Sequence, residues 1–154
     1  MRKAWVVLLL ALACSREVPV FVPTQTDWER YWKDKLVGNS LVVSRQARTE
    51  RVEMGVYLSP EERYLWWEHN LSSGKCYWEG GVYTLILPGP QSVQIVFIPE
   101  EVAPGYERNL GLRWSMWLYP VDENEVLAQE GRFYERMRIE EGRKVPDLEV
   151  FRGK

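Results

Sequence analysis

Apolar and polar residues alternate along several short segments downstream of residue 40. In residues 51–58, Val52, Met54, Val56 and Leu58 alternate with polar, small or aromatic neighbours. Neighbouring side chains on a strand point to opposite faces, so this alternation predicts a strand with one buried face. Two later segments show the same alternation and predict two more strands, 112–119 and 133–139. Residues 148–151 are a further candidate strand that would close the sheet.

Two apolar segments, 83–87 and 93–98, flank the sequence Pro88-Gly89-Pro90-Gln91. Proline and glycine favour a tight turn here, so the pair predicts a β-hairpin. Both segments are apolar at nearly every position, and we therefore expect both faces of this hairpin to be covered.

Two segments fit either a helix or a strand. Ser59-Pro60-Glu61-Glu62 is a good helix start, but Tyr64-Leu65-Trp66-Trp67 favours a strand by residue type. We favour the strand, with a turn at Ser72-Ser73-Gly74 leading back into residues 75–79. Residues 122–129 likewise fit a helical turn or a strand.

A helical period precedes these strands. Trp28, Tyr31, Trp32 and Leu36 fall on one helical stripe, which predicts an amphipathic helix of about ten residues. Thr26 is its candidate N-cap, in a capping box with Glu29, and Gly38 is a suitable stop. We expect the stripe to pack on the sheet; the alternative is a stripe that faces a membrane.

Together these patterns predict a mainly β fold. The chain is short enough for one domain, which we place over residues 24–154. We expect a single antiparallel β-barrel or β-sandwich domain, preceded by one short amphipathic N-terminal helix.

The first fourteen residues have a different character. Arg2 and Lys3 precede an uninterrupted apolar run, residues 4–12, which ends in Leu10-Ala11-Leu12-Ala13-Cys14. The run is too short for a membrane-spanning helix, which needs about 20 residues, but it fits the apolar region of a secretory signal. With small residues before the cysteine, this start resembles a bacterial lipoprotein precursor. The alternative is an ordinary secretory signal, because Ala11-Leu12-Ala13 is also a cleavage sequence.

The resemblance implies that residues 1–13 are a signal peptide and that Cys14 carries acyl chains, palmitate among them. The protein would then be lipid-anchored to a membrane of the bacterial cell envelope, inner or outer. Residues 14–23 contain Pro19 and Pro23, which favour an extended tether, with an edge strand through Val18, Val20 and Val22 as the alternative.

Composition excludes several function classes. With 20 basic and 22 acidic side chains, the chain lacks the basic field that nucleic acid requires. His69 is the single histidine, which excludes zinc sites built from several histidines, and no nucleophile elbow accompanies it. Nucleotide-binding glycine motifs are absent from the sequence. We therefore expect no enzyme activity, metal or cofactor. A glycan-cleaving carboxylate pair is the weaker alternative, because 22 acids always contain some pair.

Eight tryptophans are the remaining functional lead. Large core side chains are the simplest interpretation, but Trp66 and Trp67 are adjacent and cannot share one face of a strand; Trp114 and Trp117 conflict in the same way. One member of each pair must face solvent, lie under the helix or line a ligand cavity.

These positions suggest an aromatic site for an apolar or glycan ligand, formed by Trp66 or Trp67, Trp114 or Trp117, and Tyr83. A calycin-like barrel on a lipid anchor would suit such a site, but the G-x-W motif of lipocalins is missing after Gly38. The alternative function is a structural or assembly subunit that binds another envelope protein through an exposed aromatic patch.

Overall fold

The structure, a computed structural model, describes residues 25–46 and 51–142. One helix, α2 (Gln25–Leu36), precedes eight strands. The strands are β1 (Ser40–Gln46), β2 (Arg51–Leu58), β3 (Arg63–Asn70), β4 (Cys76–Gly89), β5 (Ser92–Val102), β6 (Trp114–Pro120), β7 (Glu125–Glu130) and β8 (Phe133–Glu140). A short 3-10 helix, η1 (Glu107–Asn109), lies between β5 and β6.

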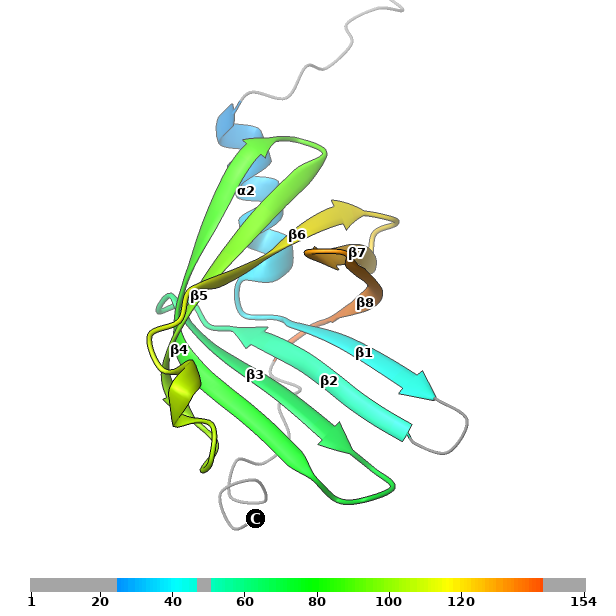
Figure 1. Cartoon of the computed structure of the whole chain (residues 1–154). Helices are drawn as coiled ribbons and strands as arrows, with labels where there is room; N and C mark the ends of the chain where they lie inside the picture. The colour runs from blue at the N-terminus through cyan, green and yellow to red at the C-terminus, as the bar shows by residue number, and fades with distance from the viewer. Residues whose placement is uncertain (1–24, 47–50, 143–154) are drawn as a thin grey trace, which may run out of the picture.

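The strands form a closed antiparallel barrel in which each strand pairs with its neighbours in chain order (Figure 1). The barrel closes where β1 pairs with β8, over only three residue pairs, from Ser40 with Glu140 to Val42 with Arg138. The mainly β expectation is therefore confirmed, and the barrel, not the sandwich, is the observed form. Strand β8 therefore closes the barrel within the described residues.

Alternating side chains of the strands fill the barrel interior, as the two-residue period predicts. On β2 the inward residues are Met54, Val56 and Leu58, each less than a tenth exposed. The hairpin of β4 and β5 is also confirmed, with Val93, Ile95 and Phe97 buried inside. Its outer face is not fully covered, contrary to expectation, because Ile86 is 45% exposed where the hairpin extends beyond the barrel wall.

Helix α2 lies across one end of the barrel. Trp32 and Leu36 are buried among the inward-facing strand residues. The Lys35 side chain donates a hydrogen bond to the backbone oxygen of Glu123 at the β6–β7 turn, at 2.6 Å. Tyr31 is 46% exposed, so its predicted place in the buried stripe is wrong. It lies about 100° around the helix from Trp32 and so misses the narrow line that Trp32 and Leu36 share.

The ends of several elements also differ from expectation. Helix α2 begins at Gln25, so Thr26 is inside the helix instead of capping it, whereas Gly38 ends it with a φ of 82°. Leu112 precedes β6 and is 60% exposed, because the chain turns at Gly111 and pairs with β5 only from Trp114 onward.

Both ambiguous segments are strands. Residues 63–70 form β3, and the turn after Asn70 leads back into β4, as we favoured. Residues 122–124 form a turn from which β7 begins at Glu125.

The predicted signal peptide, Cys14, the tether and the candidate strand 148–151 lie outside the described residues. Within the described ranges, no helix combines the length and the apolar character needed to cross a membrane.

Candidate ligand-binding site at the open end of the barrel

Two adjoining cavities lie at the end of the barrel that α2 leaves open. Their volumes are about 290 and about 280 Å³, and both are lined by Trp66, Glu68 and Glu130. We call the two cavities together the mouth. The first cavity extends toward Glu79 and Trp114, and the second extends into the barrel toward methionine side chains.

Strand register explains which side chains meet in the mouth. Trp66 and Glu68 are two residues apart on β3, so both point inward. On the neighbouring strand, Glu79 pairs with Trp66 and Tyr77 pairs with Glu68. Cross-strand partners point to the same face of a sheet, and these four side chains therefore reach the barrel interior together.

An aromatic cluster forms the floor of the first cavity. Trp66 and Trp114 meet edge to face, with ring centroids 5.3 Å apart and an interplanar angle of 84°. Phe97 stacks on Trp114 at 4.3 Å, and Tyr64 meets Phe97 edge to face at 4.7 Å. One face of Trp114 is therefore covered, and Trp66 itself is only 9% exposed. The cluster holds both indoles in fixed orientations.

Glu79 is a buried carboxyl group between two of these rings. One of its oxygens accepts hydrogen bonds from the Tyr64 hydroxyl at 2.7 Å and from Trp114 Nε1 at 3.3 Å. Burial raises the pKa of Glu79, although hydrogen bonds from Tyr64, Trp114 and Tyr77 oppose that shift. Burial and the neighbouring Glu79 carboxyl also raise the pKa of Tyr64. Glu79 thus fixes the orientation of the Trp114 indole.

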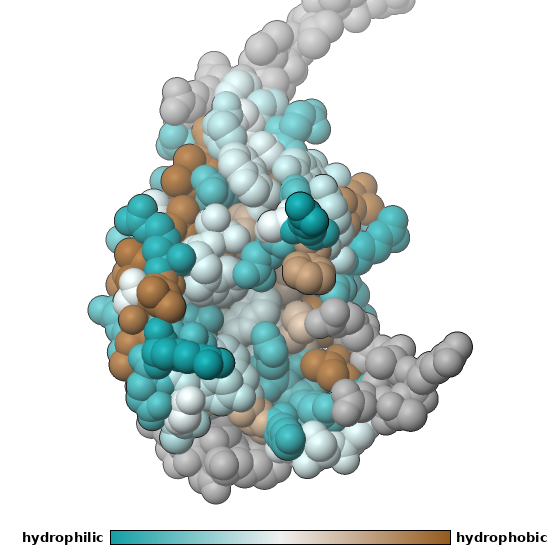
Figure 2. All heavy atoms as spheres, viewed as in Figure 1, coloured by the Kyte–Doolittle hydropathy of each residue, from teal (hydrophilic) through white to brown (hydrophobic). Residues whose placement is uncertain are grey.

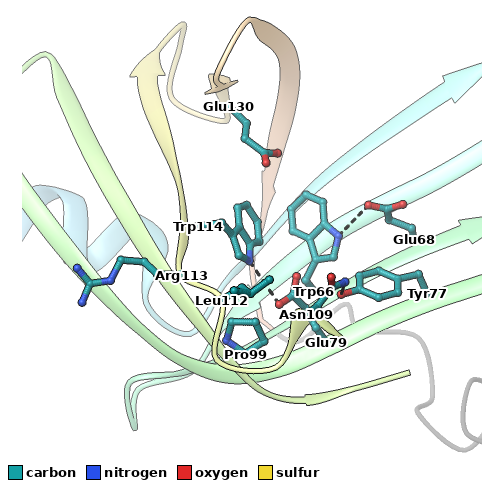
Figure 3. Close-up of a pocket in the computed structure, with 10 residues that line it drawn as sticks. All are labelled: Trp66, Glu68, Tyr77, Glu79, Pro99, Asn109, Leu112, Arg113, Trp114 and Glu130. Carbon is teal, nitrogen blue, oxygen red and sulfur yellow. Dashed lines mark hydrogen bonds between the residues drawn. The ribbon is translucent and has the colours of Figure 1, made fainter. Parts of the chain in front are cut away.

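Two further carboxyl groups lie near the indoles, Glu130 above them and Glu68 beside Trp66 in the view of Figure 3. Glu68 accepts a hydrogen bond from Trp66 Nε1 at 3.1 Å. Glu130 extends from the end of β7 toward the indoles, and burial together with the charge of Glu68 raises its pKa. The ion pairs between described residues involve neither of these carboxyl groups nor Glu79. Glu68, Glu79 and Glu130 therefore form no ion pair with a basic side chain of the described chain.

The second cavity is apolar below its rim. Met54, Met116 and Met137 line it from three different strands, and Ala128 adds a small side chain that leaves space. Phe133 lies at its rim and is 80% exposed. Methionine side chains adapt their shape to a bound apolar group more readily than branched ones do.

The structure brings together two of the aromatic residues proposed from the sequence, Trp66 and Trp114. Trp117 points to the outside of the barrel and is partly exposed. Tyr83 lies near α2, where its hydroxyl donates to the Ser59 backbone oxygen at 2.7 Å. Burial, together with the charges of Glu62 and Glu61, raises the pKa of Tyr83 to about 12. Tyr83 borders a separate groove beside α2, whose other lining residues, including Lys33, Asp34 and Glu62, are mostly exposed.

Trp67 has none of the three environments that we expected for the outward member of its pair. It is fully buried on the outside of the barrel, in a second apolar cluster with Val42, Trp78 and Ala103. Gly55 pairs with it across the strands and has no side chain, which leaves room for the indole ring.

Sequence reasoning missed the carboxyl groups of the mouth, Glu68, Glu79 and Glu130. The signal that could have found Glu79 is the two-residue period of a strand. Glu79 is four residues before the inward-facing Tyr83 on the same strand, and this even spacing predicts that its carboxyl group also faces inward. Among the described residues, no group of three or more His, Cys, Asp or Glu side chains is placed to hold a metal ion.

Comparisons of the chain with protein-family models, with curated proteins and with solved structures found no match.

Proposed function

We propose that this protein is a lipid-anchored, non-catalytic protein of the bacterial cell envelope that binds a small apolar molecule in the mouth of its barrel. The observation that carries the binding proposal is the mouth itself, with its fixed indoles above a methionine-lined cavity. Small-molecule sites are typically concave and mainly apolar, with a few placed polar groups, and the second cavity has that composition. The anchor rests on the sequence of residues 1–14.

The geometry favours an apolar ligand over a glycan. A sugar ring stacks on an aromatic face that is open to solvent, but Phe97 covers one face of Trp114 and Trp66 is nearly buried. The second cavity is lined by methionine thioethers and aromatic rings, which contact an apolar group better than they contact sugar hydroxyls.

Binding is tested with N-phenyl-1-naphthylamine, a neutral apolar dye whose fluorescence rises when it leaves water. The full chain carrying Cys14→Ser avoids competition from acyl chains. We expect a saturable, single-site fluorescence increase. Phe133→Ser removes an aromatic wall of the cavity and should weaken binding by about threefold or more, because each buried CH₂ contributes about 0.8 kcal/mol.

The matched control is Tyr134→Ser on the same hairpin. Tyr134 is also exposed, at 58%, but does not line the mouth. Its loss should leave the affinity unchanged. A second variant, Ala128→Leu, fills the cavity and should abolish dye binding while circular dichroism shows an intact barrel. Equal affinities of the Phe133 and Tyr134 variants, or full binding after Ala128→Leu, would contradict the proposal.

A second candidate function rests on the outside of the barrel. Apolar side chains gather over β4 and β5 on the surface drawn in Figure 2, where Ile86 is 45% exposed. Trp117 pairs with Gln94 beside this region and also points outward. Such a face suits an assembly subunit that docks on another envelope protein. Photo-crosslinking from position 117 in cells, with exposed Lys75 as the control position, would give a specific adduct only if this face binds a protein.

A further inference from the structure

The polar groups of the mouth share one property: they accept hydrogen bonds and offer almost no donors. Glu68, Glu79 and Glu130 are acceptors when ionised. The indole N–H groups of Trp66 and Trp114 are already used, one by Glu68 and the other by Glu79. A ligand in the mouth therefore meets indole rings and carboxylate oxygens, not indole donors.

Three other nitrogen-bearing side chains, Asn109, Arg113 and Gln129, border the mouth. Gln129 donates to the Gly131 backbone oxygen at 3.1 Å. The Asn109 amide donates one N–H to the Tyr77 hydroxyl at 3.2 Å, which leaves its second N–H as a donor and its carbonyl oxygen as an acceptor. Arg113 borders the first cavity, but Figure 3 shows its guanidinium group pointing away from the indoles. The charged end of the mouth is thus anionic and rich in acceptors.

Charge and apolar surface are also separated along the mouth. The carboxyl groups of Glu68 and Glu130 lie at the junction of the two cavities, and the methionines lie deeper in the barrel. A ligand that satisfies both regions has an apolar body and, at one end, a group that carries positive charge and several N–H donors. A carboxylate or phosphate at that end would face Glu68 and Glu130, neither of which forms an ion pair with a described residue.

We propose that the mouth binds an amphipathic primary amine, with its ammonium group between Glu68 and Glu130 and its apolar body against Met54, Met116 and Met137. This inference rests on the proposed function and names its ligand class. An ammonium group supplies three donors to the carboxylates. The apolar body displaces water from the methionine-lined cavity.

The test compares three ligands of equal chain length, decylamine, decanol and decanoate, below their micelle-forming concentrations at pH 7. Each displaces N-phenyl-1-naphthylamine from the full chain carrying Cys14→Ser. We expect decylamine to bind about tenfold more tightly than decanol, since a charge-assisted hydrogen bond contributes about 1.5–3 kcal/mol and 1.4 kcal/mol is a factor of ten. Decanoate should bind most weakly.

Substitutions test whether Glu68 and Glu130 recognise the positive charge of the ammonium group. Glu68→Gln with Glu130→Gln should reduce decylamine affinity to that of decanol and leave decanol unchanged, because glutamine keeps the acceptor for Trp66 Nε1. Glu61→Gln, at the exposed turn near α2, is the matched control and should change neither ligand.

Each outcome bears on one of the two proposals. Equal binding of decylamine and decanol, tighter binding of decanoate, or an unchanged preference in the double variant would overturn the amine inference while the apolar site stands. If neither the dye nor any of the three ligands binds, the proposed function fails and the inference fails with it.

Discussion

The indole ring of Trp67 occupies the space that a side chain on Gly55 would need. A Cβ added at position 55 would lie 2.5 Å from Cζ2 of Trp67 and 2.7 Å from the backbone oxygen of Leu41. The two residues are cross-strand partners on β2 and β3, so the glycine and the tryptophan form one packing unit on the outside of the barrel. The burial of Trp67 depends on the absence of a side chain opposite it.

Gly55→Ala should therefore destabilise the barrel. Overpacking of this kind typically costs about 1–3 kcal/mol, because either the indole or the backbone must move. Urea denaturation measures the change in the free energy of unfolding. Gly89→Ala is the matched control, since nothing lies within 4 Å of a Cβ at that position, and it should change stability by less than about 0.5 kcal/mol. Equal effects of the two substitutions would show that the Trp67 contact is not the cause.

The buried carboxyl group of Glu79 predicts a pH-dependent stability. Its pKa is raised in the folded chain, so the folded state binds this proton more tightly than the unfolded state does. The stabilisation is present at acid pH and is lost as pH rises from the ordinary carboxyl value through the raised pKa. Titratable groups that face it are Tyr64 and Glu68 on β3 and Tyr77 on β4.

Glu79→Gln should remove this component, because glutamine mimics the protonated form. Urea midpoints measured from pH 4 to 8 should fall less steeply with pH in the variant than in the wild type, and the variant should be the more stable protein at pH 8. Glu61→Gln, an exposed residue, should keep the wild-type slope. Parallel curves for wild type and Glu79→Gln would contradict the prediction.

Trp114 and Trp117 lie on one strand and should report differently on ligand binding. Decanol in the mouth changes the surroundings of Trp114, which lines the first cavity, but not those of the outward-facing Trp117. Trp114→Phe should therefore reduce the decanol-induced change in intrinsic fluorescence, because Trp114 contacts Trp66, which lines both cavities, and Trp117→Phe should preserve that change. The opposite pattern would place the bound molecule on the outer face of the barrel.

The lipid anchor is tested at the two cysteines. Cys14→Ser should abolish acylation and release the protein from membranes, because stable anchoring requires two or more acyl chains. Cys76→Ser should leave the anchor intact, since Cys76 lies in β4. Mass spectrometry of the purified protein and membrane fractionation measure both effects. A Cys14→Ser variant that stays on the membrane, with no acyl group on the wild type, would contradict the proposal that the protein is a lipoprotein.

Local patterns predicted the strands well, because burial on one face leaves a two-residue period in the sequence. The inward positions of Val56 and Leu58, and the hairpin around Gly89, follow from neighbouring residues alone. The barrel itself did not follow, since closure depends on three pairs between β1 and β8, which are about a hundred residues apart. The two-residue period of β8 predicts that Phe133 is buried. It is 80% exposed because it lies at the tip of the hairpin between β7 and β8.

The candidate site was harder to predict than the fold. Trp66 and Trp114 were singled out from their positions on strands, but nothing in the sequence distinguishes Glu79 from the other acidic residues except its even spacing from Tyr83. The role of Glu130 depends on the β7–β8 turn, which brings it to the same two cavities as Glu68 from a strand far away in the chain. Charge clusters assembled from three strands leave no local pattern.

Closure of one end by Trp32 and Leu36 has a consequence for how any cargo moves. Among the described residues, the end opposite α2 is the one that gives access to the two cavities, so a molecule bound there leaves by the route through which it entered. A ligand that enters with its apolar body first leaves with its charged end first. A membrane surface or a protein that receives this ligand therefore contacts its charged end first.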